Sequence, residues 1–344
     1  MTTYKDAGVD VAAGDAAIDR IRATVQDTYT PGVLADIGAF GACFAPDLEG
    51  MEAPVLVSSI DGVGTKLKVA ARMGRYDTVG RDLVNHCVND IAVCGARPLF
   101  FLDYYGVGTL DPDTAEAVVQ GFATACSANG CALVGGEMAE MPDVYGEDDF
   151  DLVGSIVGVV DKAALLQGEA VRPGDVLLGL PATGLHTNGY TLARTVLFEA
   201  YDVDDRPPAL EGASVGEALL RVHRSYLPAI QALLHDDLAQ GLAHITGGGL
   251  PGNLARILPA GCAAAVDYEA WTRPPLFSLI QEQGAVPEAD MRRTFNLGVG
   301  LVAVVRPEAV EAATSCLAGA GVPDAVRIGR VVSDASSDAS EAPD

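Results

Sequence analysis

The chain has 344 residues, 49% of them hydrophobic, so it is long enough to bury two cores of roughly 150 residues each. Its formal net charge of −25 argues against nucleic-acid binding, and the even spread of acidic residues within a hydrophobic sequence argues against a disordered acidic protein. No apolar run approaches the ~20 residues of a membrane span and no signal-like segment begins the chain, which predicts a cytoplasmic protein without a membrane partner.

Lysine and cysteine usage indicate the environment in which the protein works. Only four of the 22 basic residues are lysines, and a diffusely acidic, lysine-poor surface is typical of halophilic proteins, whose charge preserves solubility in strong salt. The seven cysteines are odd in number and lack a Cys-x-x-Cys pair. They therefore indicate buried thiols in a reducing compartment and support neither a zinc site nor a disulfide framework.

Hydrophobic periodicity predicts alternating strands and helices, hence an α/β (α+β) fold. Strands are expected at 54–57, 99–105, 131–134, 152–160, 176–180, 242–246, 298–305 and 325–332. Helices are expected at 14–25, 67–73, 80–94, 111–129, 191–199, 253–258, 274–282 and 307–319. A turn at 172–175 predicts the division into an N-terminal domain, a C-terminal domain and a disordered acidic tail, at 1–170, 171–332 and 333–344.

The Gly-rich sequence 58–66 joins a predicted strand to a predicted helix, a geometry that binds phosphate through backbone N–H groups. The Thr65 hydroxyl and the Lys66 ammonium would add to the contacts made at Gly62 and Gly64. Asp61 would repel a phosphate, so a divalent cation is expected between the two. An ordinary strand-to-helix connector is the alternative interpretation.

Acidic residues on two other elements could bind the same cation. Asn89 and Asp90 lie in the last turn of the helix 80–94, where the helix dipole disfavours an acid, whereas Asp82 and His86 on the same polar face are expected to be solvated. Glu137 follows a strand and two glycines, which places it at a sheet edge. These oxygen donors together with Asp61 predict a Mg²⁺ site.

Three further segments contain candidate ligand contacts. The loop 31–41, with Gly38 and Gly41, is either a mobile surface loop or a lid over a ligand. Asp103, near the end of the strand 99–105, is a candidate nucleotide contact. His186 lies beside Asn188 in a Gly-flanked loop at a helix start, so it is either an ordinary histidine or a catalytic one.

The sequence 247–252 has the Gly-x-Gly-x-x-Gly form of a dinucleotide-binding turn, with Asp267 about 20 residues further on. The helix expected after it is too short for the crossover of that fold. A phosphate-binding turn formed by Thr246, Gly247, Gly248 and Gly249 is therefore the preferred interpretation.

Together these stretches resemble one family, phosphoribosylformylglycinamidine cyclo-ligase, also called aminoimidazole ribonucleotide synthetase. The matching strings occur in the family's order and run along nearly the whole chain. They are Tyr4–Asp10, Asp61–Lys66, Val88–Asp90, Pro98–Tyr105, Leu133–Pro142, Gly146–Asp148, His186–Tyr190, His244–Gly249 and Arg293–Asn296. Two departures are Ala39, where the family often has glycine, and the absence of basic residues at 26–30, which puts an anion contact in doubt.

The resemblance implies ATP-dependent ring closure of formylglycinamidine ribonucleotide in purine synthesis, with release of ADP and phosphate. It also implies a homodimer in which strands of the two N-terminal domains form a shared barrel. Charge neutralisation by Mg²⁺ and Lys66 would assist phosphoryl transfer, and His186, or else His244, would move a proton during ring closure. A small-molecule kinase of the same superfamily, similar to thiamine-monophosphate kinase, and an oxidoreductase using the 247–252 turn remain alternatives.

Overall fold

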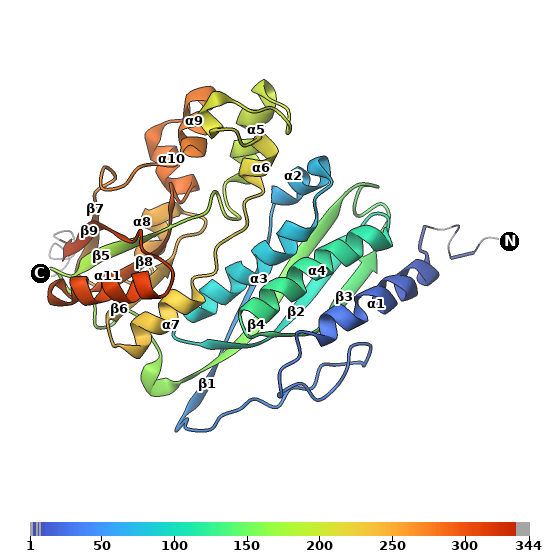
Figure 1. The fold of residues 1–344 in the computed structure, drawn as a ribbon, viewed down its shortest axis with the longest axis horizontal. Helices are drawn as coiled ribbons and strands as arrows, with labels where there is room; N and C mark the ends of the chain where they lie inside the picture. Colours follow the sequence, from blue (N-terminus) through green and yellow to red (C-terminus); the bar gives the residue numbers. More distant parts are fainter. Residues whose placement is uncertain (1–2, 5, 7, 335–344) are drawn as a thin grey trace, which may run out of the picture.

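The computed structural model describes residues 3–334 except 5 and 7, and the chain forms two α/β units, each built on one sheet (Figure 1). The first sheet has the order β1-β4-β2-β3, and its strands are β1 (Pro54–Gly62), β2 (Arg97–Val107), β3 (Ala132–Glu140) and β4 (Phe150–Asp161). The second has the order β6-β8-β5-β9-β7, and its strands are β5 (Val176–Pro181), β6 (Ala239–His244), β7 (Cys262–Val266), β8 (Val299–Val305) and β9 (Val326–Ser333). The predicted two-unit α/β fold is confirmed.

Helices cover one face of the first sheet and both faces of the second. The first sheet carries α1 (Val11–Gln26), α3 (Asp77–Ala92) and α4 (Pro112–Ala128) on a single face (Figure 1). In the second, alternate strand residues pack toward α8 (Gly249–Leu254) on one side and toward α7 (Leu227–His235) and α11 (Val310–Gly319) on the other. The remaining helices are α2 (Lys66–Met73), α5 (Tyr190–Ala200), α6 (Val215–Leu219), α9 (Pro275–Gly284), α10 (Glu288–Thr294) and the short 3₁₀ turns η2 (Lys162–Ala164), η3 (Pro208–Leu210) and η4 (Pro307–Ala309).

Local sequence explains where α4 and α1 begin. The Asp111 side chain accepts hydrogen bonds from the backbone N–H groups of Asp113 and Thr114, and Pro112 occupies the first position of α4. The Asp10 side chain caps α1 in the same way. Within the described residues, no helix combines the length and the apolar character that crossing a bilayer requires.

The sequence pattern predicts no counterpart of α7 or α10, and β1 continues through the Gly-rich sequence to Gly62 rather than ending at 57. Three further elements differ from the sequence-based expectation in their bounds. β3 continues through the glycines to Glu140, so Glu137 lies within a strand rather than after one. α8 begins at Gly249, inside the Gly-rich turn, rather than at 253. β9 includes Ser333, where the sequence predicts the start of the acidic tail, and residues 335–344 of that tail lie outside the described part of the chain.

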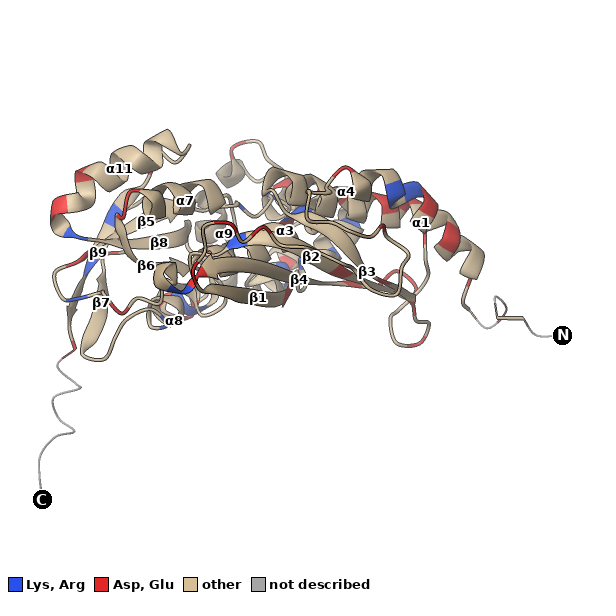
Figure 2. Cartoon of the chain, turned by 90° about the horizontal axis from the view of Figure 1, so that it is seen from below, with Lys and Arg blue, Asp and Glu red and all other residues tan. Residues whose placement is uncertain are grey.

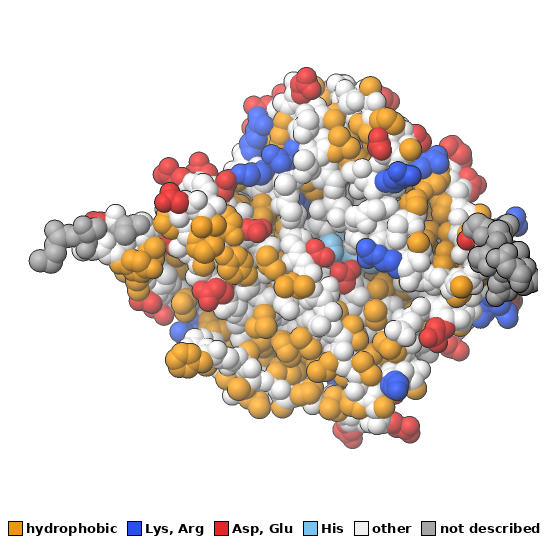
Figure 3. All heavy atoms as spheres, turned by 180° about the vertical axis from the view of Figure 1, so that it is seen from behind, with side chains coloured by type: hydrophobic (Ala, Val, Ile, Leu, Met, Phe, Trp, Pro, Cys, Tyr) orange, Lys and Arg blue, Asp and Glu red, His pale blue; other side chains and the backbone are white. Residues whose placement is uncertain are grey.

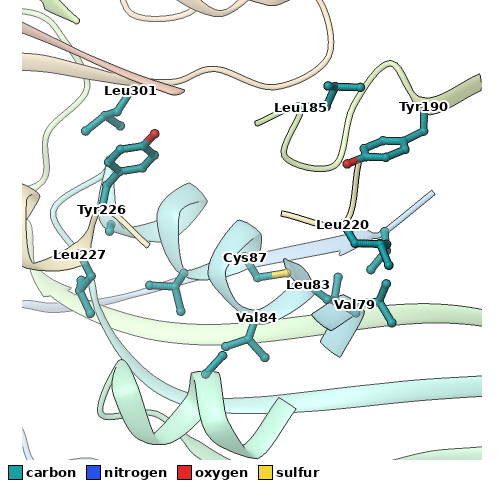
Figure 4. Packing of buried hydrophobic residues seen from close by; sticks show 14 of the residues in the cluster. Val79, Leu83, Val84, Cys87, Leu185, Tyr190, Leu220, Tyr226, Leu227 and Leu301 are labelled. Carbon is teal, nitrogen blue, oxygen red and sulfur yellow. The ribbon is translucent and has the colours of Figure 1, made fainter. Parts of the chain in front are cut away.

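Helix α3 is buried on both sides. Leu83 and Cys87 pack in the same core cluster as Tyr226 and Leu301 of the second unit (Figure 4). Asp82 is 0% exposed and His86 is 3% exposed. The prediction that the polar face of this helix is solvated is therefore wrong, because the second unit covers it.

A buried ion pair joins α2, α3 and the second unit. The Lys66 ammonium lies 2.7 Å from Asp82 Oδ2, and both side chains are 0% exposed. The same ammonium donates to the backbone carbonyl groups of His186, at 3.2 Å, and Arg221, at 2.8 Å. Asp82 in turn accepts the backbone N–H of His223 at 2.7 Å. The ion pair therefore anchors two second-unit segments to the first unit.

We expect Lys66→Met to lower the free energy of unfolding by about 3–5 kcal/mol, because it leaves the Asp82 carboxylate buried without a cation. Adding Asp82→Asn, which keeps an acceptor for the His223 N–H, should recover part of that loss. Urea denaturation of both variants measures the effect. The control is Lys68→Met, whose ion pair with Asp149 is about half exposed and should contribute within about 1 kcal/mol. Equal losses for the two single variants would contradict this account of Lys66.

Candidate functional site

Four of the five histidines meet where α3 packs against the second unit. The rings of His186 and His223 stack at 3.9 Å between centroids, and the Nε2 atoms of His223 and His244 are 3.0 Å apart. The His86 ring lies 5.1 Å from that of His244. Because no more than 5% of any of the four is exposed, the cluster lies beneath the surface.

Each histidine comes from a different segment. His86 lies on α3, and His244 ends β6 opposite Leu301 of β8. His223 precedes α7, and its backbone N–H is fixed by Asp82. His186 precedes α5 in a left-handed backbone conformation with a φ of 62°. Its carbonyl group is tied to Lys66, which holds this strained turn against the first unit.

Two carboxylates lie on the outer side of the cluster. Asp61 Oδ2 is 2.9 Å from His86 Nε2, and Asp90 Oδ1 is 2.7 Å from His244 Nδ1. The second Asp90 oxygen lies 3.6 Å from His86 Nε2. The side chains of Asp61 and Asp90 are 40% and 26% exposed, so solvent reaches the carboxylates first. Figure 3 shows a small histidine surface beside acidic side chains near the middle of one face of the molecule.

Burial and charge divide these groups into neutral and ionised members. Burial, and then the neighbouring cationic groups, lower the pKa of His186 and His223 well below the usual value, so both rings are neutral at pH 7. Burial opposes charge on His86, but its hydrogen bond to Asp61 and the nearby carboxylates raise its pKa. Burial likewise opposes ionisation of Asp90, yet its contacts with His244 and His86 hold its pKa below the usual value.

Two of the four predicted metal ligands come together, and two do not. Asp61 and Asp90 both approach His86. Asn89 is 0% exposed, and its amide is engaged by the backbone of Arg224 and Tyr226, so its prediction as a ligand is wrong. Glu137 is exposed on β3, separated from β1 by two intervening strands and hence by about 14 Å. Glu137 therefore does not approach Asp61 within one chain, and its function as a ligand remains a prediction.

Predicted phosphate-binding turns from the two units both lie against the 187–191 segment, beside the cluster. Gly64 and Thr65 are exposed, and Thr65 Oγ1 lies 3.1 Å from Thr191 Oγ1 at the start of α5. Gly247 and Gly248 are exposed too, and a Cβ added at Gly247 would lie 3.2 Å from Asn188 Oδ1. Backbone N–H groups of both turns therefore lie at the junction of the units.

Other predicted phosphate contacts are less accessible. Lys66 is buried in its ion pair and is not available to a phosphate in this structure. The Thr246 hydroxyl lies 3.2 Å from Asn253 Oδ1, and Gly249 packs so closely against the Arg292 carbonyl that only glycine fits. Burial raises the pKa of Asp103, on the helix-covered face of the first sheet, to about 7.

Two predicted glycine contacts lie in an open segment. Gly38 and Gly41 are exposed, and a Cβ added at either would meet nothing within 4 Å. The neighbouring Phe40 is fully exposed. The described structure thus places no side chain over this loop, and its function as a lid remains a prediction.

The oxidoreductase alternative does not fit the second sheet. A dinucleotide fold needs parallel strands joined through the glycine turn. Here β6 pairs with β8 and β7 pairs with β9, in both cases antiparallel. The strand that precedes the turn and the strand that follows it are therefore not neighbours, and the Rossmann interpretation is excluded.

Sequence reasoning missed three residues of the junction. The sequence pattern does not distinguish His223, and it predicts solvent exposure for Asp82 and His86. A signal was present in the spacing, since Asp82, His86 and Asp90 recur every four residues along one face of a long helix. A polar stripe of this length is solvated in an isolated helix, so the signal could not be read without knowing what covers the helix.

Comparison with protein families matches both units. The model described as AIR synthase related protein, N-terminal domain, matches residues 48–160. The corresponding C-terminal domain model matches residues 172–340. The matches together span most of the chain.

Relatives and solved structures extend this similarity over nearly the full length. The chain is 52% identical to a phosphoribosylformylglycinamidine cyclo-ligase of Sorangium cellulosum, covering 96% of this chain and 95% of the relative. It is 50% identical to one of Myxococcus xanthus, with 96% of each covered. Among solved structures, the thiamine-monophosphate kinase of Stenotrophomonas maltophilia has a TM-score of 0.67 at 21% identity, covering 93% of this chain and 94% of the kinase. Hydrogenase maturation protein HypE in complex with ATP has a TM-score of 0.63 at 21% identity, covering 92% and 87%.

Proposed function

The chain belongs to the phosphoribosylformylglycinamidine cyclo-ligase family, and on that premise we propose that it closes the imidazole ring of aminoimidazole ribonucleotide with conversion of ATP to ADP and phosphate. The observation that best supports this function is that about half the residues, along almost the whole chain, are identical to those of cyclo-ligase relatives. It is a C–N bond-forming ligase of purine biosynthesis. Phosphorylation of the amide oxygen of formylglycinamidine ribonucleotide creates a leaving group, which the amidine nitrogen displaces.

The described residues fit a divalent cation that accompanies ATP. Asp61 and Asp90 are partly exposed carboxylates that approach one another at His86, and the turns at Gly62–Thr65 and Gly247–Gly248 lie alongside. A cation such as Mg²⁺ there would neutralise phosphate charge. The chain's own contribution would be to orient the phosphates with backbone N–H groups at both turns.

His186 is our proposed proton-transfer residue for ring closure, with His244 as the second candidate and Asn188 beside them. Burial keeps His186 neutral at pH 7, and its Nδ1 has no hydrogen-bond partner among the described residues. His244 is oriented by Asp90, as a base often is by a carboxylate. Because both rings are covered, substrate access to either would require the two units to separate slightly.

The function is tested by incubating the purified protein with ATP, Mg²⁺ and formylglycinamidine ribonucleotide in strong salt. We expect aminoimidazole ribonucleotide and inorganic phosphate to form in equal amounts, because each closure releases one phosphate. The kinase alternative predicts instead a phosphorylated product and no free phosphate. Absence of both products across a range of salt concentrations would rule out the proposed function.

We expect His186→Asn to lower kcat by ~10²–10⁴-fold, the range for a lost general acid or base. Asparagine tolerates the left-handed backbone at this position, so the turn should survive. Steady-state kinetics with nucleotide affinity measured separately provides the check, and exposed His235→Asn is the control. A raised KM for the ribonucleotide with kcat preserved would instead indicate substrate binding, and no change would exclude both functions.

We also propose a homodimer formed through the uncovered face of the first sheet. Leu56 and Ile60 on β1 are 66% and 69% exposed, and Phe100 and Leu102 share cross-strand rows with this face. Figure 3 shows a broad hydrophobic area on the side of the molecule opposite α1, α3 and α4. Apolar patches of this kind mark association surfaces, and pairing two such sheets would form the shared barrel.

Acidic residues are distributed over both units rather than gathered in one patch (Figure 2). We propose halophilic adaptation on this basis, because dispersed charge of −25 repels itself unless salt screens it.

We propose a cytoplasmic location as well, since all seven cysteines are free thiols, as a reducing compartment would keep them.

Ile60→Glu should convert the dimer to monomer, because it places a charge in the apolar face. Sedimentation velocity in molar and in millimolar KCl measures the oligomeric state. The wild-type dimer should weaken at low salt, because the Debye length grows to ~30 Å at 0.01 M and the acidic chains then repel each other over a longer distance. Ile18→Glu, at a partly exposed position on α1, should leave association unchanged. A wild-type monomer at all salt concentrations would contradict the dimer.

A further inference from the structure

His223 lies between the two histidines proposed for proton transfer. Its ring stacks on that of His186 at 3.9 Å between centroids with an interplanar angle of 18°, and its Nε2 lies 3.0 Å from His244 Nε2. The side chain is 0% exposed, so it does not itself contact a substrate bound at the surface of the junction. An effect of His223 on ring closure would therefore act through its two neighbours.

Helix α3 holds His223 at three points. Asp82 accepts its backbone N–H at 2.7 Å, and Asn85 donates to its backbone carbonyl group, also at 2.7 Å. One turn further along the helix, the Asn89 amide nitrogen lies 3.3 Å from the ring atom Nε2. The spacing of three and four residues places these side chains on one face of α3. The helix therefore fixes both the backbone of His223 and the direction of its ring.

The contacts of Asn89 assign the proton of the His223 ring. The Asn89 oxygen accepts the backbone N–H of Tyr226 at 2.8 Å, and its nitrogen donates to the carbonyl group of Arg224 at 2.8 Å, so the amide has one consistent orientation. The remaining N–H of that nitrogen is the donor toward His223 Nε2, which must accept. Burial lowers the pKa of His223 well below the usual value, so the ring is neutral and its proton lies on Nδ1.

This assignment leaves a buried donor without a partner. His223 Nδ1 makes no hydrogen bond among the described residues. An unpaired buried N–H costs about 1–3 kcal/mol, which a residue present only for stability would not be expected to bear. The ring is thus oriented by what its Nε2 contacts, at the expense of its other nitrogen.

An accepting Nε2 on His223 limits what His244 can do. The proton between the two Nε2 atoms must belong to His244, because His223 carries none at that position. His244 Nδ1 faces Asp90 Oδ1 at 2.7 Å, and a hydrogen bond there orients the ring whichever of the two atoms holds the proton. Both nitrogens of His244 are therefore engaged within the protein. Its Nε2 has no free lone pair for a substrate proton, which favours His186 as the proton-transfer residue.

His186, in contrast, retains a free N–H group. The backbone N–H of Thr183 donates to His186 Nε2 at 3.3 Å, so the neutral ring holds its proton on Nδ1, which has no partner among the described residues. His223 covers one face of this ring. Gly300 of β8 approaches its edge, where an added Cβ would lie 2.5 Å from Cε1. These two contacts confine the His186 ring to one plane.

We propose that His223 is a positioning residue for ring closure, which in its Nδ1–H form stacks on His186 to fix the plane of that ring and accepts the Nε2–H of His244. The assignment of the proton stands on the described contacts, whereas its consequence for catalysis rests on the proposed function. Because α3 holds His223, the position of the first unit is transmitted to two rings carried by the second.

The proton assignment is tested on the full-length protein without substrate. Long-range proton–nitrogen correlation spectra of protein with isotope-labelled histidine rings distinguish the Nδ1–H form from the Nε2–H form. The signals that disappear in His223→Gln identify this residue. We expect the Nδ1–H form, because Asn89 donates to Nε2. An Nε2–H form would overturn the assignment.

Steady-state kinetics tests the positioning function. His223→Leu, which removes the ring face and the acceptor, should lower kcat by about 10- to 100-fold with both KM values unchanged, because misplacing a reacting group slows the chemical step. His223→Gln can place an amide oxygen near the position of Nε2 and should recover most of this loss. His223→Asn is too short to do so and should resemble His223→Leu, which keeps the test valid if the leucine variant does not fold.

Ser225→Ala is the matched control, because it removes a hydrogen bond between the same segment and the first unit, to Asn129 at 2.6 Å, without touching a histidine. It should lower stability to urea but leave kcat unchanged, and circular dichroism confirms that each variant is folded. Wild-type kcat in folded His223→Leu or His223→Asn would overturn the proposal, as would an equal loss of kcat in Ser225→Ala. Failure of the proposed function would appear instead as a wild-type protein that forms no aminoimidazole ribonucleotide, so the two failures are distinguishable.

Discussion

The polar face of α3 can be buried because the second unit supplies hydrogen-bond partners along its length. Asp82 accepts from the His223 backbone and pairs with Lys66, Asn85 donates to the His223 carbonyl at 2.7 Å, and Asn89 accepts from Tyr226 at 2.8 Å. A buried polar group left without its partner costs about 1–3 kcal/mol, so a displacement of the 223–226 segment along the helix would break several contacts at once. This requirement fixes how the two units sit against each other.

The functional junction follows from that fixed placement. His86 is carried on α3 and His244 on β6, so their approach to one pair of carboxylates depends on the same interface that buries Asp82. Lys66 also positions the strained turn of His186 relative to the first unit, because its ammonium group donates a hydrogen bond to the His186 carbonyl group. The residue therefore contributes to the site from beneath it, through positioning rather than through contact with a phosphate.

Charge and apolar surface act in opposite directions on this molecule. A net charge of −25 favours separation of chains, whereas the uncovered sheet face with Leu56 and Ile60 favours association. Salt weakens the first effect and leaves the second in place, or strengthens it when the salt is kosmotropic. A protein with both features is best suited to concentrated salt, where the apolar face determines assembly.

The sequence by itself determined the α/β class, the order of most strands and helices, the family, and the pairing of Asp61 with Asp90 as neighbouring acids. These are carried by short-range periodicity and by contiguous strings such as Asp61–Lys66, which need no knowledge of distant contacts. Only the tertiary structure decided which polar residues are buried. Asp82, His86 and Lys66 look solvent-facing in their own helices, and they became interior because a segment more than 100 residues away covers them. Within one chain neither Glu137 nor Asn89 joins Asp61 and Asp90, since convergence on one ion depends on sheet order and on competing hydrogen bonds that local sequence does not encode.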